Sequence, residues 1–218
     1  MFEVKEISKS YEGRQVLFPV SFCLDEGQSI GIVGPNGSGK STLLRLLAQV
    51  KRPDSGRMFF RGKDVLGDRQ FLRRHLGYVP QADQLSPGLT VGQQLELWQA
   101  ACGLRGPLPE EITARMGLEP LLRRRIQTLS GGMRQRVSIA MGLLAQPEIL
   151  VMDEATTGLD LAYRQVLLDW MELFLHQGGM LVWCTHHTEE LERLCDRCLC
   201  LEEGHARWGS MEEEHMEI

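Results

Sequence analysis

Long hydrophobic runs are missing from this sequence. Its apolar stretches are short, such as "ILVM" at 149–152, whereas a membrane-spanning helix needs about 18 or more consecutive apolar residues. The first residues, "MFEVKEISKS", also lack the apolar stretch of a secretory signal peptide. We therefore expect a cytosolic protein that acts on a membrane only through a partner.

A basic excess is missing as well. The 218 residues carry a formal net charge of −5 and a pI of about 5.7, whereas nucleic-acid-binding domains usually have a positive charge. No nucleic-acid partner is therefore expected. Six cysteines are present, but the cluster "CDRCLC" at 195–200 lacks a fourth ligand at a zinc spacing. We expect reduced structural thiols rather than a metal site.

Three short apolar segments end abruptly in polar residues. They are "SIGIV", "EILVM" and "GMLVW", which are followed respectively by "GPNGSGKST", "DEA" and "CTHH". Continuous apolar strands are typical of a parallel sheet buried on both faces. Such sheets bind ligands at the carboxyl ends of their strands. This pattern predicts an α/β protein with its site at one edge of the sheet.

The remaining segments have different patterns. "FEVKEISKSY" and "RMFFRGKDV" partly alternate polar and apolar residues around turn sequences, which predicts an antiparallel β layer beside the parallel sheet. The middle of the chain is richer in Leu, Gln and Arg, and predicts a small helical subdomain at about 84–145. The core of a single domain spanning 1–218 would then comprise about 1–83 and 146–218.

The stretch "GPNGSGKST" matches the phosphate-binding pattern G-x-x-x-x-G-K-[ST], after a predicted strand and before a predicted helix. Glycines let backbone N–H groups converge on phosphate oxygens, and the helix N-terminus adds partial positive charge. We expect Lys40 to reach the β- and γ-phosphates, Ser41 to bind Mg²⁺ and Thr42 to contact the α-phosphate. The predicted nucleotide contacts of this loop are Gly34, Pro35, Asn36, Gly37, Ser38, Gly39, Lys40, Ser41 and Thr42.

Two adjacent carboxylates, Asp153 and Glu154, follow the apolar strand "ILVM". Adjacent acids alone are a weak signal, but downstream of a phosphate loop they are informative. A carboxylate in this position can hold Mg²⁺ through water, and a second one can accept a proton from an attacking water. We predict Asp153 as a metal ligand and Glu154 as the general base.

Five motifs come in the order found in the ABC ATPases. They are "GPNGSGKST", "YVPQ" at 78–81, "LSGGM" at 129–133, "ILVMDEATTGLD" at 149–160 and "CTHH" at 184–187. The chain resembles this family over essentially its whole length. The resemblance implies an α/β fold of the P-loop NTPase (RecA-like) type, with a parallel-sheet core, an antiparallel β layer and an inserted helical subdomain. It also implies ATP and Mg²⁺ as cofactors.

The "LSGG" motif in this family binds the γ-phosphate of an ATP molecule held by the other subunit. By resemblance, Ser130, Gly131 and Gly132 would complete a partner's site, and Asp160 would meet the partner's phosphate loop. Two chains would then enclose two ATP molecules head to tail. Met133 stands where the family usually has Gln. The same Met is found in ATPases similar to ABC-2-type exporters.

Three more residues take their roles from the resemblance. Gln81 would contact Mg²⁺ and the attacking water, His186 would contact the γ-phosphate, and Tyr11 would stack on adenine. His187 is adjacent, but the family's histidine directly follows a Thr or Ser, which selects His186. The predicted catalytic residues are Glu154, His186 and Gln81, and the predicted metal ligands are Ser41, Gln81 and Asp153.

The resemblance implies an ATPase subunit that drives a separate transmembrane permease, an exporter, from the inner face of the cell membrane. It would form a homodimer, or a heterodimer with a related ATPase. A soluble ABC ATPase that assembles or remodels another complex is the alternative. A GTPase is disfavoured because Asn36 is the sole asparagine of the chain, so the guanine-reading Asn-Lys-x-Asp motif is absent.

Overall fold

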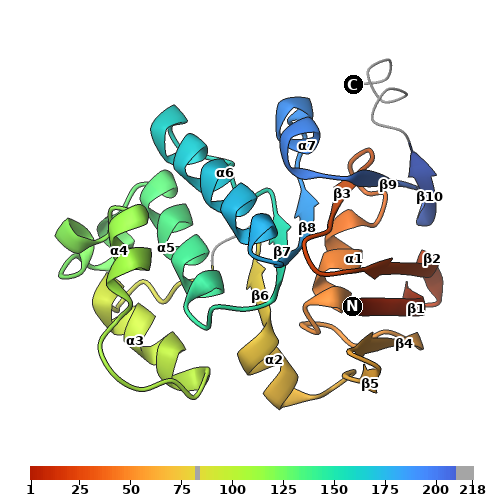
Figure 1. The fold of residues 1–218 in the computed structure, drawn as a ribbon, viewed down its shortest axis with the longest axis horizontal. Helices are drawn as coiled ribbons and strands as arrows, with labels where there is room; N and C mark the ends of the chain where they lie inside the picture. Colours follow the sequence, from red (N-terminus) through yellow and green to blue (C-terminus); the bar gives the residue numbers. More distant parts are fainter. Residues whose placement is uncertain (82–83, 210–218) are drawn as a thin grey trace.

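The computed structural model describes residues 1–81 and 84–209, and contains two β-sheets and a set of helices (Figure 1). The first sheet is antiparallel, with the strand order β2-β1-β4-β5. Its strands are β1 (Phe2–Tyr11), β2 (Arg14–Leu24), β4 (Ser55–Phe60) and β5 (Lys63–Asp64). This sheet is the antiparallel layer that the alternating N-terminal sequence predicts.

The second sheet has the strand order β10-β9-β3-β8-β7-β6. Neighbouring strands from β9 to β6 are parallel, and β10 pairs antiparallel with β9 at one edge. Its strands are β3 (Ser29–Val33), β6 (Leu76–Val79), β7 (Ile149–Asp153), β8 (Met180–Cys184), β9 (Arg197–Glu202) and β10 (His205–Gly209). Every residue of β3, β7 and β8 is buried, as their continuous apolar sequences predict.

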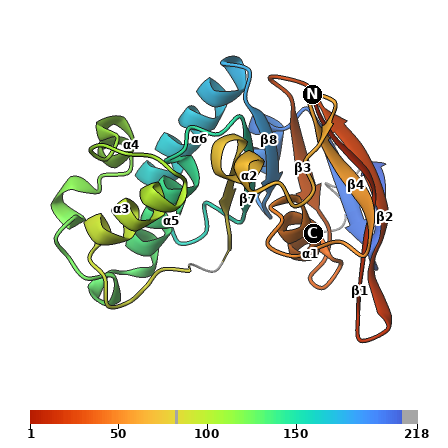
Figure 2. The same ribbon diagram turned by 90° about the horizontal axis from the view of Figure 1, so that it is seen from below.

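Helices cover both faces of this parallel sheet. They are α1 (Lys40–Leu47), α2 (Arg69–His75), α3 (Val91–Ala101), α4 (Glu110–Arg115), α5 (Gly131–Leu143), α6 (Leu161–His176) and α7 (Thr188–Leu194). In both views, α1 lies on the side of the antiparallel sheet, and α5 and α6 lie on the other side (Figures 1 and 2). Within the described ranges, none of the helices is both long enough and apolar enough to cross a membrane.

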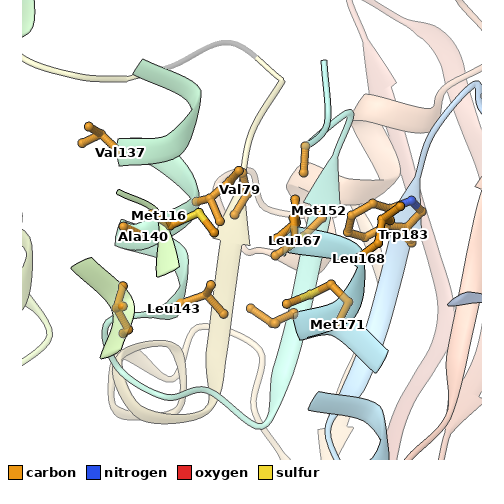
Figure 3. Close-up of a cluster of buried hydrophobic side chains, with 14 of the residues drawn as sticks. Val79, Met116, Val137, Ala140, Leu143, Met152, Leu167, Leu168, Met171 and Trp183 are labelled. Carbon is orange, nitrogen blue, oxygen red and sulfur yellow. The ribbon is translucent and has the colours of Figure 1, made fainter. Parts of the chain in front are cut away.

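The buried strands send alternate side chains into two different apolar clusters. In β7, Leu150 and Met152 belong to the cluster on the side of α5 and α6, whereas Ile149 and Val151 belong to the cluster under the antiparallel sheet. Figure 3 shows the first cluster, which also contains Trp183 of β8. Packing on both faces makes the sheet a firm support for the loops at its edge.

Helices α3, α4 and α5 lie within residues 84–145, together with the 3₁₀ turns η1 (Glu119–Leu121) and η2 (Ile126–Thr128). They form the end of the molecule opposite the antiparallel sheet (Figures 1 and 2). Helix α5 comes closest to the parallel sheet, because a Cβ atom on Gly77 of β6 would lie 2.2 Å from the carbonyl oxygen of Gly142. Its residues therefore connect the helical end with the sheet.

The cysteines of the cluster at 195–200 contribute to the core. Cys195 and Cys198 are buried on either side of the start of β9, and a Cβ atom on Gly31 of β3 would contact both sulfurs. Burial raises the pKa of Cys195 well above its usual value, which disfavours the reactive thiolate. These thiols fill space between the parallel sheet and α7.

Candidate functional site

The phosphate loop joins the end of β3 to the start of α1. Its tip at 35–37 is exposed, whereas Ser38 and Lys40 are buried. Gly39 has a φ of 107°, a left-handed conformation that glycine adopts without strain. Helix α1 begins directly after it, with no side-chain cap and no acidic residue in the first turn. The first N–H groups of α1 are therefore available to bind an anion.

Close backbone neighbours explain two glycines of this loop. A Cβ atom on Gly34 would lie 2.0 Å from the carbonyl oxygen of Leu201, and one on Gly39 would lie 3.0 Å from that of Val16. Gly204, in the turn between β9 and β10, also donates its N–H to a carbonyl of the loop at 3.0 Å. The conformation of the phosphate loop is thus determined by contacts within this chain.

Lys40 lies beneath the loop. Its ammonium donates hydrogen bonds to the carbonyl oxygens of Gly34 (2.5 Å) and Pro35 (3.0 Å). The buried hydroxyl of Ser38 has no hydrogen-bond partner among the described residues. Because an unpartnered buried hydroxyl costs free energy, this group suits a ligand that supplies an acceptor. Together with the start of α1, these groups make a cradle for a phosphate chain.

Parallel pairing brings the predicted acids and the histidine to the same edge of the sheet. Strand β8 lies between β3, which precedes the loop, and β7, which carries the acids. Asp153 pairs with Cys184 in the register, and the N–H of Glu154 donates to the carbonyl of Cys184 at 2.9 Å. Glu154 therefore lies beside the segment that carries His186. The structure brings these residues together from strands far apart in sequence.

The carboxyl group of Glu154 is buried at the end of β7. Burial raises its pKa, against the opposing effect of His186, and the neighbouring Asp153 adds to the rise. Oxygen Oε2 accepts a hydrogen bond from the Thr157 hydroxyl at 3.4 Å, whereas Oε1 has no hydrogen-bond partner among the described residues. A carboxylate with a raised pKa and an open acceptor position is suited to removing a proton from water.

The backbone of Glu154 is in the left-handed region, with a φ of 52°. This conformation is uncommon for a residue other than glycine and carries strain. It turns the chain sharply at the end of β7. Such outliers cluster at functional sites, which agrees with the predicted role of this residue.

His186 is half exposed, and its Nε2 lies 3.0 Å from Oε1 of Glu154. This is an ion-pair distance, and Oε1 is buried with no hydrogen-bond partner among the described residues. His187 occupies the N-cap position of α7 without a capping hydrogen bond from its side chain, and its backbone N–H donates to the Thr185 hydroxyl at 3.1 Å. The structure therefore places His186, not His187, against the predicted base.

Ser41 and Asp153 lie together between the phosphate loop and the end of β7. Burial raises the pKa of Asp153, and a hydrogen bond from the Ser41 hydroxyl opposes that rise. Gln81 is exposed two residues beyond the end of β6, the strand that pairs with β7. Ser41 and Asp153 therefore bring a hydroxyl and a carboxylate oxygen together, and Mg²⁺ prefers oxygen ligands of this kind.

The loop with the "LSGG" motif (residues 129–132), called here the signature loop, starts α5, on the opposite side of the parallel sheet from α1 (Figures 1 and 2). Ser130 caps this helix by accepting a hydrogen bond from the Met133 N–H at 3.3 Å. The side chain of Ser130 and the backbone of Gly131 are both exposed. The two glycine-rich loops of this chain therefore begin helices on different faces of the sheet.

The two signature glycines have different surroundings. A Cβ atom on Gly132 would lie 2.4 Å from the carbonyl oxygen of Gly158, whereas one on Gly131 would meet nothing within 4 Å. Asp160 follows close by, is exposed, and caps α6 by accepting from the Tyr163 N–H at 3.0 Å. The signature loop and the segment before α6 thus form one exposed surface.

Tyr11 is at the end of β1, and 38% of it is exposed. The Lys9 ammonium lies 5.6 Å from the centre of its ring. The same hairpin carries Val16, which contacts Gly39 of the phosphate loop. The structure therefore puts Tyr11 on a hairpin that borders this loop, with part of its ring accessible.

Two residues beside the site were not predicted to have a role. Tyr78 hydrogen-bonds to Arg45 of α1, and burial, together with the nearby Asp153, raises the pKa of Tyr78 to about 12. Tyr78 is the first residue of the motif "YVPQ", so the sequence did contain a signal for its place beside the site. Glu190 is buried and accepts a hydrogen bond from Thr185, next to His186. No signal in the sequence marked it, because an acidic residue in the first turn of a helix has an ordinary electrostatic explanation.

The predicted site residues lie at the carboxyl edge of the parallel sheet. A cavity of about 630 Å³ lies elsewhere, between α2 and the segment after α3, and is lined by residues that include Arg69, Arg73, Arg74 and Leu104. The polar chemistry described above is not in that cavity.

The family described as ABC transporter matches residues 17–157 of this chain. The chain belongs to the ABC transporter family. The match spans the phosphate loop, the signature motif and the acids Asp153 and Glu154, so the family prediction is confirmed on the residues that carry it.

Relatives and solved structures agree with this result. The Nod factor export ATP-binding protein I of Rhizobium etli is 36% identical over 206 residues, which are 93% of this chain and 65% of that protein. The protein of the same name from Ralstonia nicotianae is 35% identical over 209 residues, which are 94% of this chain and 65% of that protein. This chain therefore spans about two thirds of the length of these relatives.

Two solved structures share the fold. The structure of an ATP-binding subunit of an ABC transporter has a TM-score of 0.87 and 30% identity, covering 98% of this chain and 91% of its own. A dimeric ATP-binding cassette in a post-hydrolysis state with ADP and phosphate has a TM-score of 0.86 and 26% identity, covering 97% and 99%. The predicted fold class and the predicted ATP-binding subunit are confirmed, and a transporter ATPase is supported over the assembly alternative.

Proposed function

We propose that two copies of this chain, or one copy and a related ATPase, enclose two ATP molecules head to tail and hydrolyse them to drive a separate transmembrane exporter. One observation carries the proposal. A phosphate loop, a buried base and a histidine meet at one edge of the sheet, while the signature loop faces solvent on a different surface. An ATPase site divided in this way requires a second subunit to complete it.

ATP binding rests on the phosphate loop and α1. The phosphates occupy the cradle of residues 34–42, where backbone N–H groups and the start of α1 supply positive charge. Lys40 exchanges its bonds to the carbonyls of Gly34 and Pro35 for the β- and γ-phosphates. Tyr11 stacks on the adenine ring, since part of its ring is accessible beside the loop.

Hydrolysis rests on the side chains at the strand ends. Glu154 accepts a proton from the attacking water, and its raised pKa supports this role. His186 contacts the γ-phosphate and Gln81 orients the water. Water attacks the γ-phosphorus, the bond to the β-phosphate oxygen breaks, and ADP and phosphate are the products.

Mg²⁺ is the proposed cofactor, held by Ser41, Gln81 and Asp153. When bound, this ion neutralises phosphate charge. The oxygen ligands gathered at this edge support the assignment, together with the burial of Asp153, which leaves its charge in need of a counterion.

The partner subunit supplies the second half of each site. Its Ser130, Gly131 and Gly132 would approach the γ-phosphate from the side opposite the phosphate loop, and its Asp160 would meet that loop. The exposure of Ser130 and Gly131 supports this arrangement, as does the start of α5, which attracts anions. The dimeric state of a solved relative is consistent with it.

The membrane partner would dock at the inner face of the cell membrane. Both relatives described above are export ATP-binding proteins by name, which supports an exporter as the partner. We assign the core to about 1–83 and 146–218 and the helical subdomain to about 84–145. Because α5 packs against β6, movement of this subdomain would be transmitted to the sheet.

The decisive test of this function is the variant Glu154→Gln. We expect it to bind ATP but to hydrolyse it at least about 100-fold more slowly, because the base is lost. With ATP and Mg²⁺ it should accumulate as a dimer, and with ADP it should remain a monomer. Light scattering after size-exclusion chromatography measures the mass, and phosphate release measures the rate.

Glu6→Gln is a matched control, because Glu6 is exposed and has a similar left-handed backbone, with a φ of 49°. It should behave as the unmodified chain. Hydrolysis at the unmodified rate by Glu154→Gln would show that the base is a different residue. Capturing Glu154→Gln with Mg²⁺ and ATP from detergent-solubilised membranes then tests the partner, and recovery of soluble proteins alone would contradict the exporter.

A further inference from the structure

Glu190 of α7 is a buried carboxylate that the mechanism above does not use. Its side chain is fully buried, and both oxygens are bonded. Oε1 accepts from the Arg164 guanidinium at 2.8 Å, and Oε2 accepts from the Trp183 indole at 3.2 Å and the Thr185 hydroxyl at 2.8 Å. Three donors from three elements thus converge on one carboxylate.

Stability alone does not explain why a carboxylate is buried at this position. Removing a carboxylate from water is costly, and its hydrogen bonds with Arg164 and the other donors offset that cost without a large surplus. Apolar side chains would pack well here, because the Trp183 ring belongs to the apolar cluster that includes Leu167 and Leu168 of α6 (Figure 3). The groups that Glu190 holds in place indicate what it does.

One of those groups, the Thr185 hydroxyl, is hydrogen-bonded next to His186. The Thr185 hydroxyl donates to Glu190 and at the same time accepts from the N–H of His187 at 3.1 Å. His186 lies between these two residues, so both sides of it are tied to the same hydroxyl. Its Nε2 is 3.0 Å from Oε1 of Glu154. The position of His186 against the base therefore depends on the orientation of Thr185.

The other group leads to the surface proposed to meet the partner subunit. Arg164 is in the first turn of α6, and its backbone N–H donates a hydrogen bond to the carbonyl of Asp160 at 2.9 Å. Asp160 caps the same helix. The pair of Arg164 and Glu190 therefore joins the start of α6 to the segment that carries His186. Movement of that start on dimerisation would reach the histidine through this pair.

We propose that Glu190 is a positioning residue for His186, acting through Thr185 and coupling the histidine to the start of α6. This inference rests on the proposed ATP hydrolysis. Glu190 contacts neither the phosphate loop nor the residues proposed to hold Mg²⁺ in its described hydrogen bonds. Its loss should therefore reduce turnover and leave ATP binding nearly unchanged.

The test compares kcat and KM for ATP in Glu190→Gln, Thr185→Val and Thr185→Ser. We expect Glu190→Gln and Thr185→Val each to lower kcat by about tenfold or more, because a displacement of about 1 Å is enough for such losses. KM should change by less than about twofold. Thr185→Ser retains the hydroxyl and should keep most of kcat. The double variant Glu190→Gln with Thr185→Val should be no slower than the slower single variant, because both changes break the same link.

Glu172→Gln is the matched control. Glu172 of α6 binds Arg193 of α7 at 2.6 Å, so it joins the same two helices without reaching His186. It should leave kcat unchanged. Thermal unfolding of each variant shows whether a loss of activity follows a loss of stability.

Three results would overturn the inference. They are an unchanged kcat in Glu190→Gln, an equal loss in Glu172→Gln, or losses that multiply in the double variant. Thr185→Val keeps the test valid if Glu190→Gln does not fold. Absence of ATP hydrolysis by the unmodified chain would instead refute the proposed function itself, and with it the role of Glu190.

Discussion

The phosphate loop and the signature loop are both rich in glycine and both start a helix, yet their surroundings are opposite. The phosphate loop is enclosed by its own chain, since Gly34 and Gly39 each face a backbone carbonyl at close range. At the signature loop, Gly131 has open space where a side chain would be, and Ser130 is exposed. Glycine therefore has two uses here, and the second one calls for a partner molecule.

The largest expected effect is at the phosphate loop, because we propose that this loop, and not the signature loop, binds ATP in the isolated chain. Lys40→Ala removes the ammonium and should weaken ATP binding by about 100-fold, the size of effect expected for a lost charge-assisted hydrogen bond. Isothermal titration calorimetry with ATP measures the affinity.

Lys51→Ala changes an exposed lysine shortly after α1 and should leave the affinity unchanged. If Lys40→Ala bound ATP as tightly as the unmodified chain does, the assignment of the phosphate loop would be wrong.

An intermediate effect tests the signature loop through its two glycines. Gly131→Ala should leave both Tm and the ATP affinity of the monomer unchanged, because its Cβ meets nothing within 4 Å. It should still lower turnover by about tenfold or more, since the added methyl group would displace the partner's γ-phosphate. Differential scanning calorimetry and phosphate release measure the two quantities.

Gly132→Ala provides the contrast. Its Cβ would lie 2.4 Å from the Gly158 carbonyl oxygen, so this variant should lower Tm as well as turnover. Normal turnover in Gly131→Ala would mean that the signature loop does not approach a nucleotide.

The smallest expected effect concerns stability at the strand end. Burial raises the pKa of Asp153, so the folded chain binds this proton more tightly than the unfolded chain does. At a pH above the raised pKa, the charged form is present in both states and its burial lowers stability. Asp153→Asn should therefore raise Tm by about 2–4 °C near neutral pH, and the gain should shrink as the pH falls.

Asp169→Asn is expected to have the opposite sign. A hydrogen bond from Arg193 lowers the pKa of Asp169, so its charged form stabilises the folded chain above its unfolded pKa, and this variant should lower Tm slightly near neutral pH. Thermal melts over a range of pH compare the two. A gain for Asp153→Asn that grew towards acid pH would contradict the explanation.

Much of this fold could be predicted because its signals are local in sequence. Strands β3, β7 and β8 are buried on both faces and are continuous apolar runs. The polar residues that follow them therefore predicted which edge of the sheet carries the site. The phosphate loop was recognisable because its chemistry requires particular residues at fixed spacing. The resemblance to a family then assigned Gln81 and Tyr11, whose residue types alone carry little information.

Other features depend on which elements pack together, and these could not be predicted. The bond of Arg164 to Glu190 joins residues on different helices, and no spacing in the sequence marks it. The approach of Gly132 to Gly158 likewise depends on how α5 lies beside the start of α6. The contact of His186 with Glu154 follows from the parallel register of β7 and β8, which was expected only as proximity at a sheet edge.

At Glu154, whose backbone is left-handed, thermal stability and ATP turnover favour different residues. Glycine adopts this conformation without strain, and Glu154→Gly would also remove a carboxyl group whose burial raises its pKa. We expect this variant to melt at a higher temperature than the unmodified chain while losing turnover. A selection for heat resistance alone would thus discard the residue that we propose as the base of hydrolysis, and only a selection for ATP turnover would retain it.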